Sequence, residues 1–445
     1  MQQRRSEGRF HEAAASKSGQ GRRPLLQVVR LDRYESGTAS SMDARETLRH
    51  LGPGIISGIS DLDPTTVATL AIIGSALGYQ LLWVMTLLLP MLITVQVVSA
   101  RIGVATQKGL EAAIRERFGM VWAVAAMCLA VSVNILTLAA DLEGGAEALQ
   151  LLTGVAWRWF VVPIALVLGA LLLFGSYSVI QRVLRYVLVV FGAYIIAGFM
   201  ARPDWLSVIY HALVPSLSLN PAYVAGVLAL LGTVLTSYVY FWEAIEAQEE
   251  RRPIGDIWLV EMDAAVGIVA ALTLSAFIIL TTAATTGTTG TPVHSAEEAA
   301  RALVPLAGPL AGEIFALGLL ASALLAVPVL ASTTAYILSE AFQWGGGLDS
   351  REATAHPFYA VLLGSLAIGV AVALAGVEPF QILFIASIAG GLGAPVLLAL
   401  MIMVARDPEI MRDHPISGAL SSLGWLTTVV LGGASILYVI QQFLG

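Results

Sequence analysis

Two carboxylates, a proline and two hydroxyls lie together inside an apolar segment near the start of the chain. The stretch Asp61-Leu62-Asp63-Pro64-Thr65-Thr66 interrupts the run from Leu51 to Ala76, which otherwise has the length and composition of a membrane helix. Carboxylates at bilayer depth are costly and commonly mark ion paths. Proline interrupts helical hydrogen bonding and disfavours helical geometry at the preceding residue. Because broken helices at membrane depth must be buried or line a cavity, the segment indicates a cation site at a helix break.

A second polar interruption lies in the apolar stretch 221–248. Residues 232–238 contain a glycine and hydroxyl side chains at Thr233, Thr236 and Ser237. Hydroxyl groups can bond back to the backbone and allow a helix to unwind. Hydrogen bonding within an ordinary helix interface is the alternative interpretation. Together with the first interruption, the segment predicts a second broken helix.

The composition is that of a polytopic α-helical membrane protein. Of the 445 residues, 57% are hydrophobic and 12% are charged, whereas soluble domains have about 25% charged residues. The single cysteine, Cys128, excludes an intramolecular disulfide and a thiolate metal cluster. Residues 1–45 are polar and contain no signal-peptide pattern, so we expect a disordered cytoplasmic tail followed by a transmembrane domain over 46–445.

Eleven apolar stretches have the length of membrane spans, and the third and eighth are longer than a bilayer needs. They cover residues 52–75, 80–103, 121–152, 160–176, 183–201, 221–248, 258–284, 310–342, 357–376, 380–405 and 417–443. The two interruptions fall in spans one and six. This spacing is typical of a 5+5 inverted repeat in which the first helix of each repeat is discontinuous and the site lies at the membrane midplane.

The basic residues predict the orientation in the membrane. Only Arg158, Arg202 and Arg301 of the 24 Lys and Arg residues fall in the loops on the side opposite to the N-terminal tail. Because basic residues gather in cytoplasmic loops, the N-terminus is predicted to be cytoplasmic. An odd number of spans then puts the C-terminus outside. We expect a multi-pass protein of the cell (inner) membrane.

The interrupted segments and their flanks resemble the Nramp family of divalent-metal transporters. The similarity includes Gly52-Pro53-Gly54, Asp63-Pro64, Gly78-Tyr79, Leu82-Trp83, Ser99-Ala100-Arg101 and Arg115-Glu116-Arg117, and extends more loosely over most of residues 50–440. This resemblance implies a LeuT-type fold of eleven transmembrane helices, with a 5+5 inverted repeat plus one and with helices 1 and 6 broken. It also implies a transporter rather than an enzyme, with no bound cofactor.

The sequence departs from the usual family pattern at both breaks. Where the family usually has Asp-Pro-Gly-Asn, this chain has Asp63-Pro64-Thr65-Thr66, and the usual Met-Pro-His becomes Leu235-Thr236-Ser237. The chain thus keeps the aspartate but lacks the thioether and the imidazole. In these changes, and over Leu235 to Glu243, it resembles the divergent magnesium-transporting branch related to Nramp.

The residues at the breaks predict a metal site made entirely of oxygen atoms. The candidate ligands are Asp63, Thr66, Asp61, Thr236 and Ser237, with backbone carbonyls near Ser60 and Gly232. Carboxylate, hydroxyl and carbonyl oxygens suit Mg²⁺, Ca²⁺ and Mn²⁺, whereas thioether and imidazole favour softer metals. Mg²⁺ commonly binds through one or two carboxylates and retains water. Asp61 has two interpretations, as a ligand or as a charge in the vestibule.

Other acidic residues leave alternatives open. Asp141, Glu143 and Glu147 lie in the third span, where Nramp proteins carry an acidic pair used in proton movement. Asp141 can match either member of that pair, and the alternative is that all three acids line the outer vestibule. Glu243 lies on the inner half of the sixth span, either beside the ion path or at the cytoplasmic interface.

These observations predict a transporter for Mg²⁺, with Mn²⁺ as a second substrate, that works without proton coupling. All six histidines fall in the tail, the loops or the span edges, so none is placed to relay a proton across the core. The alternatives are a proton-coupled Mn²⁺/Fe²⁺ symporter, a sodium-coupled organic-solute symporter and a non-transporting sensor. No P-loop or nucleic-acid signature is present in the sequence. The expected partners are the metal ion and the lipid bilayer.

Overall fold

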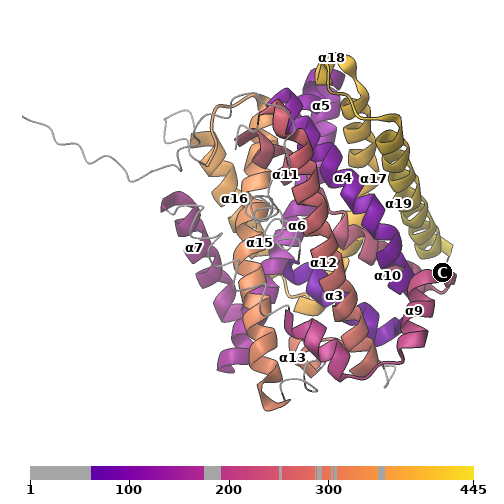
Figure 1. The fold of residues 1–445 in the computed structure, drawn as a ribbon. Coiled ribbons are helices and arrows are strands. Elements are labelled where there is room, and N and C mark those ends of the chain that lie inside the picture. The colour runs from indigo at the N-terminus through magenta and orange to yellow at the C-terminus, as the bar shows by residue number, and fades with distance from the viewer. Residues whose placement is uncertain are drawn as a thin grey trace, which may run out of the picture. The chain divides into compact units, whose positions relative to one another are not determined.

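Helices form all the regular structure in the described part of the chain (Figure 1). The structure is a computed structural model, and it describes residues 62–174, 192–249, 253–285, 287, 293–301, 304, 308–348 and 356–444. These helices belong to one structural unit, Leu48–Gly445. The predicted tail, residues 1–45, lies outside the described residues, so its disorder stays a prediction.

Each of the eleven predicted spans contains helix. In chain order the helices are α3 (Pro64–Leu77), α4 (Leu82–Thr106), α6 (Met120–Thr153), α7 (Arg158–Phe174), residues 192–200, α10 (Pro221–Val234) with α11 (Ser237–Glu249), α12 (Ile257–Thr285), α15 (Ala311–Phe342), α16 (His356–Ala373), α17 (Pro379–Arg406) and α19 (Gly418–Leu444). Eight of these spans are long and apolar enough to cross a membrane, and α3 and α7 are shorter apolar helices. The third and eighth spans are the long helices α6, with 34 residues, and α15, with 32.

Short helices connect the spans at the two ends of the bundle. They include α5 (Leu110–Phe118), α9 (Trp205–Leu213), α13 (Ala296–Ala300) and α18 (Pro408–Met411). Figure 1 shows α5 and α18 at one end and α13 at the other. Arg101 of α4 pairs with Glu261 of α12, and Arg117 of α5 pairs with Asp407 before α18, so ion pairs join segments on the side that the basic residues predict to be cytoplasmic.

The first span changes from extended chain to helix at Asp63. The backbone of Asp63 is extended, with φ −71° and ψ 168°, and α3 begins at Pro64. Proline suits the first helical position because its missing N–H would have no partner there. The carbonyl of Leu62 accepts a hydrogen bond from the Ser322 hydroxyl of α15, which holds the extended segment in place. The predicted first half of this span lies outside the described residues.

The sixth span is discontinuous, as the sequence predicts. The helix α10 ends at Val234, Leu235 has φ −103° and ψ 33°, and α11 begins at Ser237. Near the end of α10, a Cβ at Gly232 would collide with the carbonyl of Ser387 in α17. The glycine therefore permits a close helix approach beside the break.

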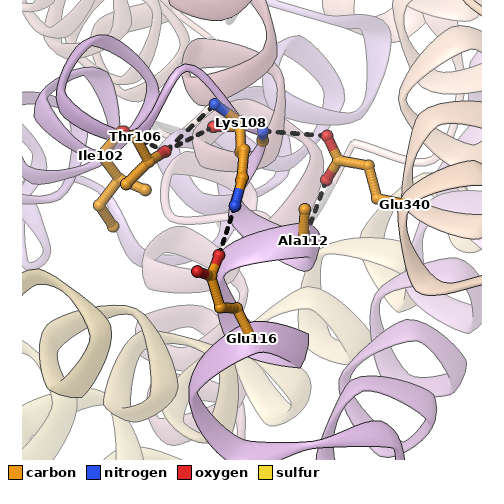
Figure 2. Close-up of polar contacts among 7 residues, drawn as sticks. Ile102, Thr106, Lys108, Ala112, Glu116 and Glu340 are labelled. Carbon is orange, nitrogen blue, oxygen red and sulfur yellow. Dashed lines mark hydrogen bonds and ion pairs between the residues drawn. The ribbon is translucent and has the colours of Figure 1, made fainter. Parts of the chain in front are cut away.

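The helix α5 is docked against the end of α15 by one carboxylate (Figure 2). Glu340 accepts hydrogen bonds from the backbone N–H of Gly109 at 3.0 Å and of Ala112 at 3.1 Å. On the exposed face of the same region, Lys108 pairs with Glu116 at 2.6 Å. Glu340 thus satisfies amides at the start of α5 that have no partner within the helix.

Candidate metal site at the two helix breaks

Asp63 lies at the start of α3 and caps it. Its Oδ1 accepts a hydrogen bond from the backbone N–H of Thr66 at 2.6 Å, and its Oδ2 accepts one from the Tyr238 hydroxyl at 3.0 Å. The residue is 1% exposed. Aspartate is a preferred capping residue, and the N-terminal end of a helix favours negative charge. The Asp-Pro-Thr-Thr sequence therefore holds a buried carboxylate at a fixed point in the core.

The two interrupted spans meet at this carboxylate. The hydroxyls of Thr66 in α3 and Thr233 in α10 lie 2.9 Å apart, and Tyr238 reaches Asp63 from α11. All four side chains are buried. The first turn of α3 thus contacts both halves of the sixth span, and the structure brings the predicted ligands Asp63 and Thr66 against the second break.

A second carboxylate, Asp141 of α6, binds the same turn of α3. Its Oδ1 accepts hydrogen bonds from the backbone N–H of Thr65 at 3.1 Å and from the Thr65 hydroxyl at 2.7 Å. Its Oδ2 has no hydrogen-bond partner in the described residues. Asp141 is fully buried, and its charge interacts with that of Asp63. Two neighbouring buried carboxyl groups are costly unless a cation or a proton compensates them.

The second break presents further oxygen atoms. Ser237 donates a hydrogen bond to Oδ1 of Asn134 in α6 at 3.0 Å, and the Asn134 amide nitrogen lies 3.4 Å from the Thr334 hydroxyl of α15. Because the Ser237 hydroxyl donates its proton to Asn134, the lone pairs of the hydroxyl oxygen remain available to coordinate a cation. Thr236 lies in the break itself and is 4% exposed. The break is therefore lined by hydroxyls that other helices orient.

Of the remaining predicted ligands, the structure describes Gly232 but not Asp61 or Ser60. The Gly232 carbonyl lies in the last turn of α10 and faces α17, since a Cβ at Gly390 would be 2.8 Å from it. Asp61 and Ser60 lie outside the described residues. Glu243 is half-buried in α11. Coordination of a metal by the predicted ligands stays a prediction, and the place of Glu243, beside the ion path or at the cytoplasmic interface, stays open.

The structure adds residues that the sequence interpretation did not assign to the site. Tyr238, Thr233 and Thr65 contact Asp63 or its neighbours, although the sequence only identified them as parts of the interrupted segments. Asn134 was missed entirely. It lies seven residues before Asp141, hence on the same face of α6, and this spacing is a signal that could have found it.

Comparison with known proteins decides the family. The family model of the natural resistance-associated macrophage protein-like proteins, Nramp, matches residues 54–441. The chain belongs to the Nramp family. Family membership places it among membrane transporters rather than enzymes, as the sequence predicts.

Relatives of similar length support this Nramp assignment. The chain is 28% identical over 414 residues to the divalent metal cation transporter MntH of Deinococcus radiodurans, covering 89% of this chain and 90% of that protein. It is also 28% identical over 399 residues to the transporter of the same name from Aeromonas hydrophila, covering 86% and 93% of the two chains. The similarity thus extends over nearly the whole of each protein.

Solved structures confirm the fold expected for an Nramp protein. A crystal structure of the Eremococcus coleocola manganese transporter matches with a TM-score of 0.71 at 18% identity, covering 92% of this chain and 90% of that one. The structure of MhsT in complex with L-phenylalanine matches with a TM-score of 0.58 at 13% identity, covering 87% and 98%. The predicted LeuT-type fold is therefore confirmed.

Proposed function

We propose that this Nramp protein transports divalent metal cations, and that it carries Mg²⁺ into the cytoplasm with Mn²⁺ as a second substrate. The observation that carries the proposal is the position of Asp63, a buried carboxylate at the meeting point of the two interrupted spans. Relatives named as divalent metal cation transporters support the general activity. The proposed setting is the inner membrane, with the N-terminus cytoplasmic and the C-terminus outside.

The chemistry of the surrounding groups supports Mg²⁺ in particular. Asp63, Thr66, Thr236 and Ser237 supply oxygen atoms, and Asp61 with the carbonyls near Ser60 and Gly232 completes the proposed ligand set. Leu235, at the second break, offers neither sulfur nor nitrogen. Oxygen ligands suit Mg²⁺ and Mn²⁺, and Mg²⁺ tends to keep several of its waters in a site with few carboxylates.

Uptake without proton coupling is part of the proposal. The membrane potential supplies about 2.3 kcal/mol per charge per 100 mV, and roughly twice that for a divalent ion. That driving force moves Mg²⁺ inward without a proton gradient. Within the described residues, the side-chain partners of Asp63 and Asp141 are hydroxyls and no histidine is among them.

Proton-coupled transport of Mn²⁺ or Fe²⁺ is the second candidate function. The observation in its favour is Asp141, which is buried beside the site and has one carboxyl oxygen without a hydrogen-bond partner in the described residues. Such a group is able to take up and release a proton as the ion arrives and leaves. The fixed hydrogen bonds of its other oxygen to Thr65 are compatible with either role.

Flux into liposomes separates the two candidates. The full-length protein is reconstituted with a Mg²⁺ dye or a pH dye inside, and a potential, negative inside, is applied. We expect Mg²⁺ to enter while the internal pH stays constant, and millimolar Mg²⁺ to inhibit Mn²⁺ uptake. Acidification that scales with metal entry and disappears in Asp141→Asn would establish proton coupling, and Mn²⁺ uptake insensitive to Mg²⁺ would contradict the oxygen site.

A further inference from the structure

A second group of carboxylates lies apart from Asp63, toward the end of the bundle that carries α13. Glu143 of α6 is fully buried, and both of its carboxyl oxygens lack a hydrogen-bond partner in the described residues. Glu147, one turn further along α6, is 6% exposed. Its Oε1 accepts a hydrogen bond from the backbone N–H of Ala296 at 2.9 Å, and its Oε2 has no partner in that part of the chain. Buried carboxyl oxygens without partners require another compensating group.

The surroundings of Glu143 and Glu147 are strongly acidic. The two residues share a face of α6 by their spacing of four, and the charge of Glu378, which precedes α17, acts on both. Arg158, at the start of α7, is the cationic group that acts on Glu143. These three carboxyl groups outnumber the one guanidinium that acts on Glu143, which leaves the region attractive to a cation of charge two.

This acidic group lies close to the central site. Between Glu143 and Glu147, a Cβ at Gly144 would be 2.8 Å from the Cβ of Pro64 in the first turn of α3. The acids are therefore at the level where α3 begins, although Glu143 projects about 200° around α6 from Asp141. An ion that leaves this region toward α3 meets the site of Asp63 next.

The segment around α13 covers Glu147. The backbone N–H of Val293 donates to the Ser75 hydroxyl of α3 at 2.9 Å, and the backbone N–H of Ala296 donates to Glu147. Val293, Ala296 and Glu147 are all buried. In this structure the segment joins the far end of α3 to α6 and covers Glu147, whereas Glu378 is exposed.

The geometry points to a loading site for a hydrated divalent cation: we propose that Glu143, Glu147 and Glu378 bind Mg²⁺ through its water shell before it passes to Asp63. The described residues contain no cluster of three His, Cys, Asp or Glu side chains close enough to hold a bare metal ion. A carboxylate that is too distant for direct coordination still binds a hydrated ion through water, and Mg²⁺ sheds its waters reluctantly. The identity of the ion rests on the proposed function.

Transport kinetics provide the first test. Glu143→Gln in the full-length protein in liposomes replaces one carboxyl group that, in the proposed site, never touches the bare ion. The apparent KM for Mg²⁺ is expected to rise by about tenfold, the usual loss when an outer partner of a bound metal is removed, while the maximal rate is nearly unchanged. Glu313→Gln, an exposed acid in the first turn of α15, is the matched control and leaves the KM unchanged. An unchanged KM in a folded Glu143→Gln protein would overturn the proposal.

Direct binding keeps this proposal separate from the proposed function. The Asp63→Ala protein has lost the central ligand, so residual Mn²⁺ binding, measured by electron paramagnetic resonance, reports on the outer acids alone. We expect one residual site that is lost in Asp63→Ala/Glu143→Gln and that hexaamminecobalt(III), a cation unable to release its ligands, displaces. Absence of residual Mn²⁺ binding, or residual binding that survives Glu143→Gln, would contradict the loading site. A wild-type protein that binds Mn²⁺ at the outer acids but carries no Mg²⁺ would contradict the proposed function alone.

Discussion

Asp63, which is buried, and Glu340, which is partly buried, both cap the start of a helix with a carboxylate, yet they differ in what their second oxygen does. Glu340 uses one oxygen for the amide of Gly109 and the other for that of Ala112. Asp63 uses one oxygen for the amide of Thr66, while the other accepts a hydrogen bond from a side-chain hydroxyl, that of Tyr238. A hydroxyl can rotate away, whereas a backbone amide cannot. The comparison indicates that a capping carboxylate is a structural joint when both of its oxygens bind amides, and that one oxygen stays accessible to the proposed ion when only the other oxygen binds an amide.

The neighbouring carboxyl groups differ in the same way. Asp141, beside Asp63, is tied to Thr65 by two hydrogen bonds. Glu111, beside Glu340, is fully buried, and neither of its oxygens has a partner in the described residues. Burial and the negative charge of Glu340 raise the pKa of Glu111 to about 9. Glu111 is therefore neutral at pH 7, and the joint under α5 carries at most one negative charge, that of Glu340, which the helix amides stabilise.

The largest effect on transport is expected from Asp63→Ala. The substitution removes the carboxylate that we propose replaces part of the water shell of the ion, so Mg²⁺ flux into liposomes is expected to fall to the background. The loss of one cap costs about 1 kcal/mol, and the apolar spans are untouched, so the protein still folds. Thermal unfolding in detergent checks the fold. Uptake of Mg²⁺ by a folded Asp63→Ala protein would remove Asp63 from the site.

The second effect concerns selectivity. Leu235→Met places a thioether at the second break, between Val234 and Thr236, where the family usually has sulfur. Because thioether sulfur favours softer metals, the ratio of Cd²⁺ or Mn²⁺ affinity to Mg²⁺ affinity should rise, by about tenfold for a gain of roughly 1.4 kcal/mol. Competition flux assays measure the ratio. Leu235→Ile adds no sulfur and serves as the control, so an equal change in both variants would assign the effect to packing.

The sequence correctly predicted the structural features that depend on residues close together in the chain. Pro64 and the hydroxyls of the sixth span are sufficient to locate both interruptions, and Asp63 with Thr66 forms a cap from neighbouring residues. The eleven apolar stretches could be read from length and hydrophobicity alone. These features depend on a few consecutive residues, so no tertiary information is needed.

Pairings across the bundle could not be predicted in this way. The contact between Asp141 and Thr65 joins residues 76 positions apart, and that between Glu340 and Gly109 joins residues 231 positions apart. Which face of α6 meets α3 depends on helix packing, and a single sequence does not specify it. Glu111 illustrates the limit, because an acid in the first turn of a short polar helix is normally solvated, and only the docking of α5 buries it.

A smaller effect on transport is expected from Glu340→Ala. Two amides at the start of α5 lose their acceptor, which costs about 1–3 kcal/mol for each buried group left unsatisfied. Hydrogen exchange in residues 109–118 should accelerate and the unfolding temperature should fall. Flux per folded molecule should stay near the wild-type value, since Glu340 has no free oxygen for the ion. Lost flux with unchanged exchange would instead make Glu340 a transport residue and would end the contrast with Asp63.

The smallest effect on transport is expected from Glu111→Gln, which tests the neutral state of Glu111. In the folded protein the pKa of Glu111 is about 9, against 4.5 for an unperturbed glutamate. Between these values the folded state binds more protons than the unfolded state, so this group makes the wild-type protein less stable as the pH rises. Glutamine does not titrate, so the unfolding temperature of Glu111→Gln should exceed that of the wild type by a margin that grows from pH 5 to pH 9.

The control is Glu116→Gln, which alters a half-exposed acid of the same helix and should leave the pH dependence unchanged. Equal slopes for Glu111→Gln and the wild type would show that Glu111 is charged in the folded protein and that the joint under α5 needs a cation, as we propose for the site at Asp63.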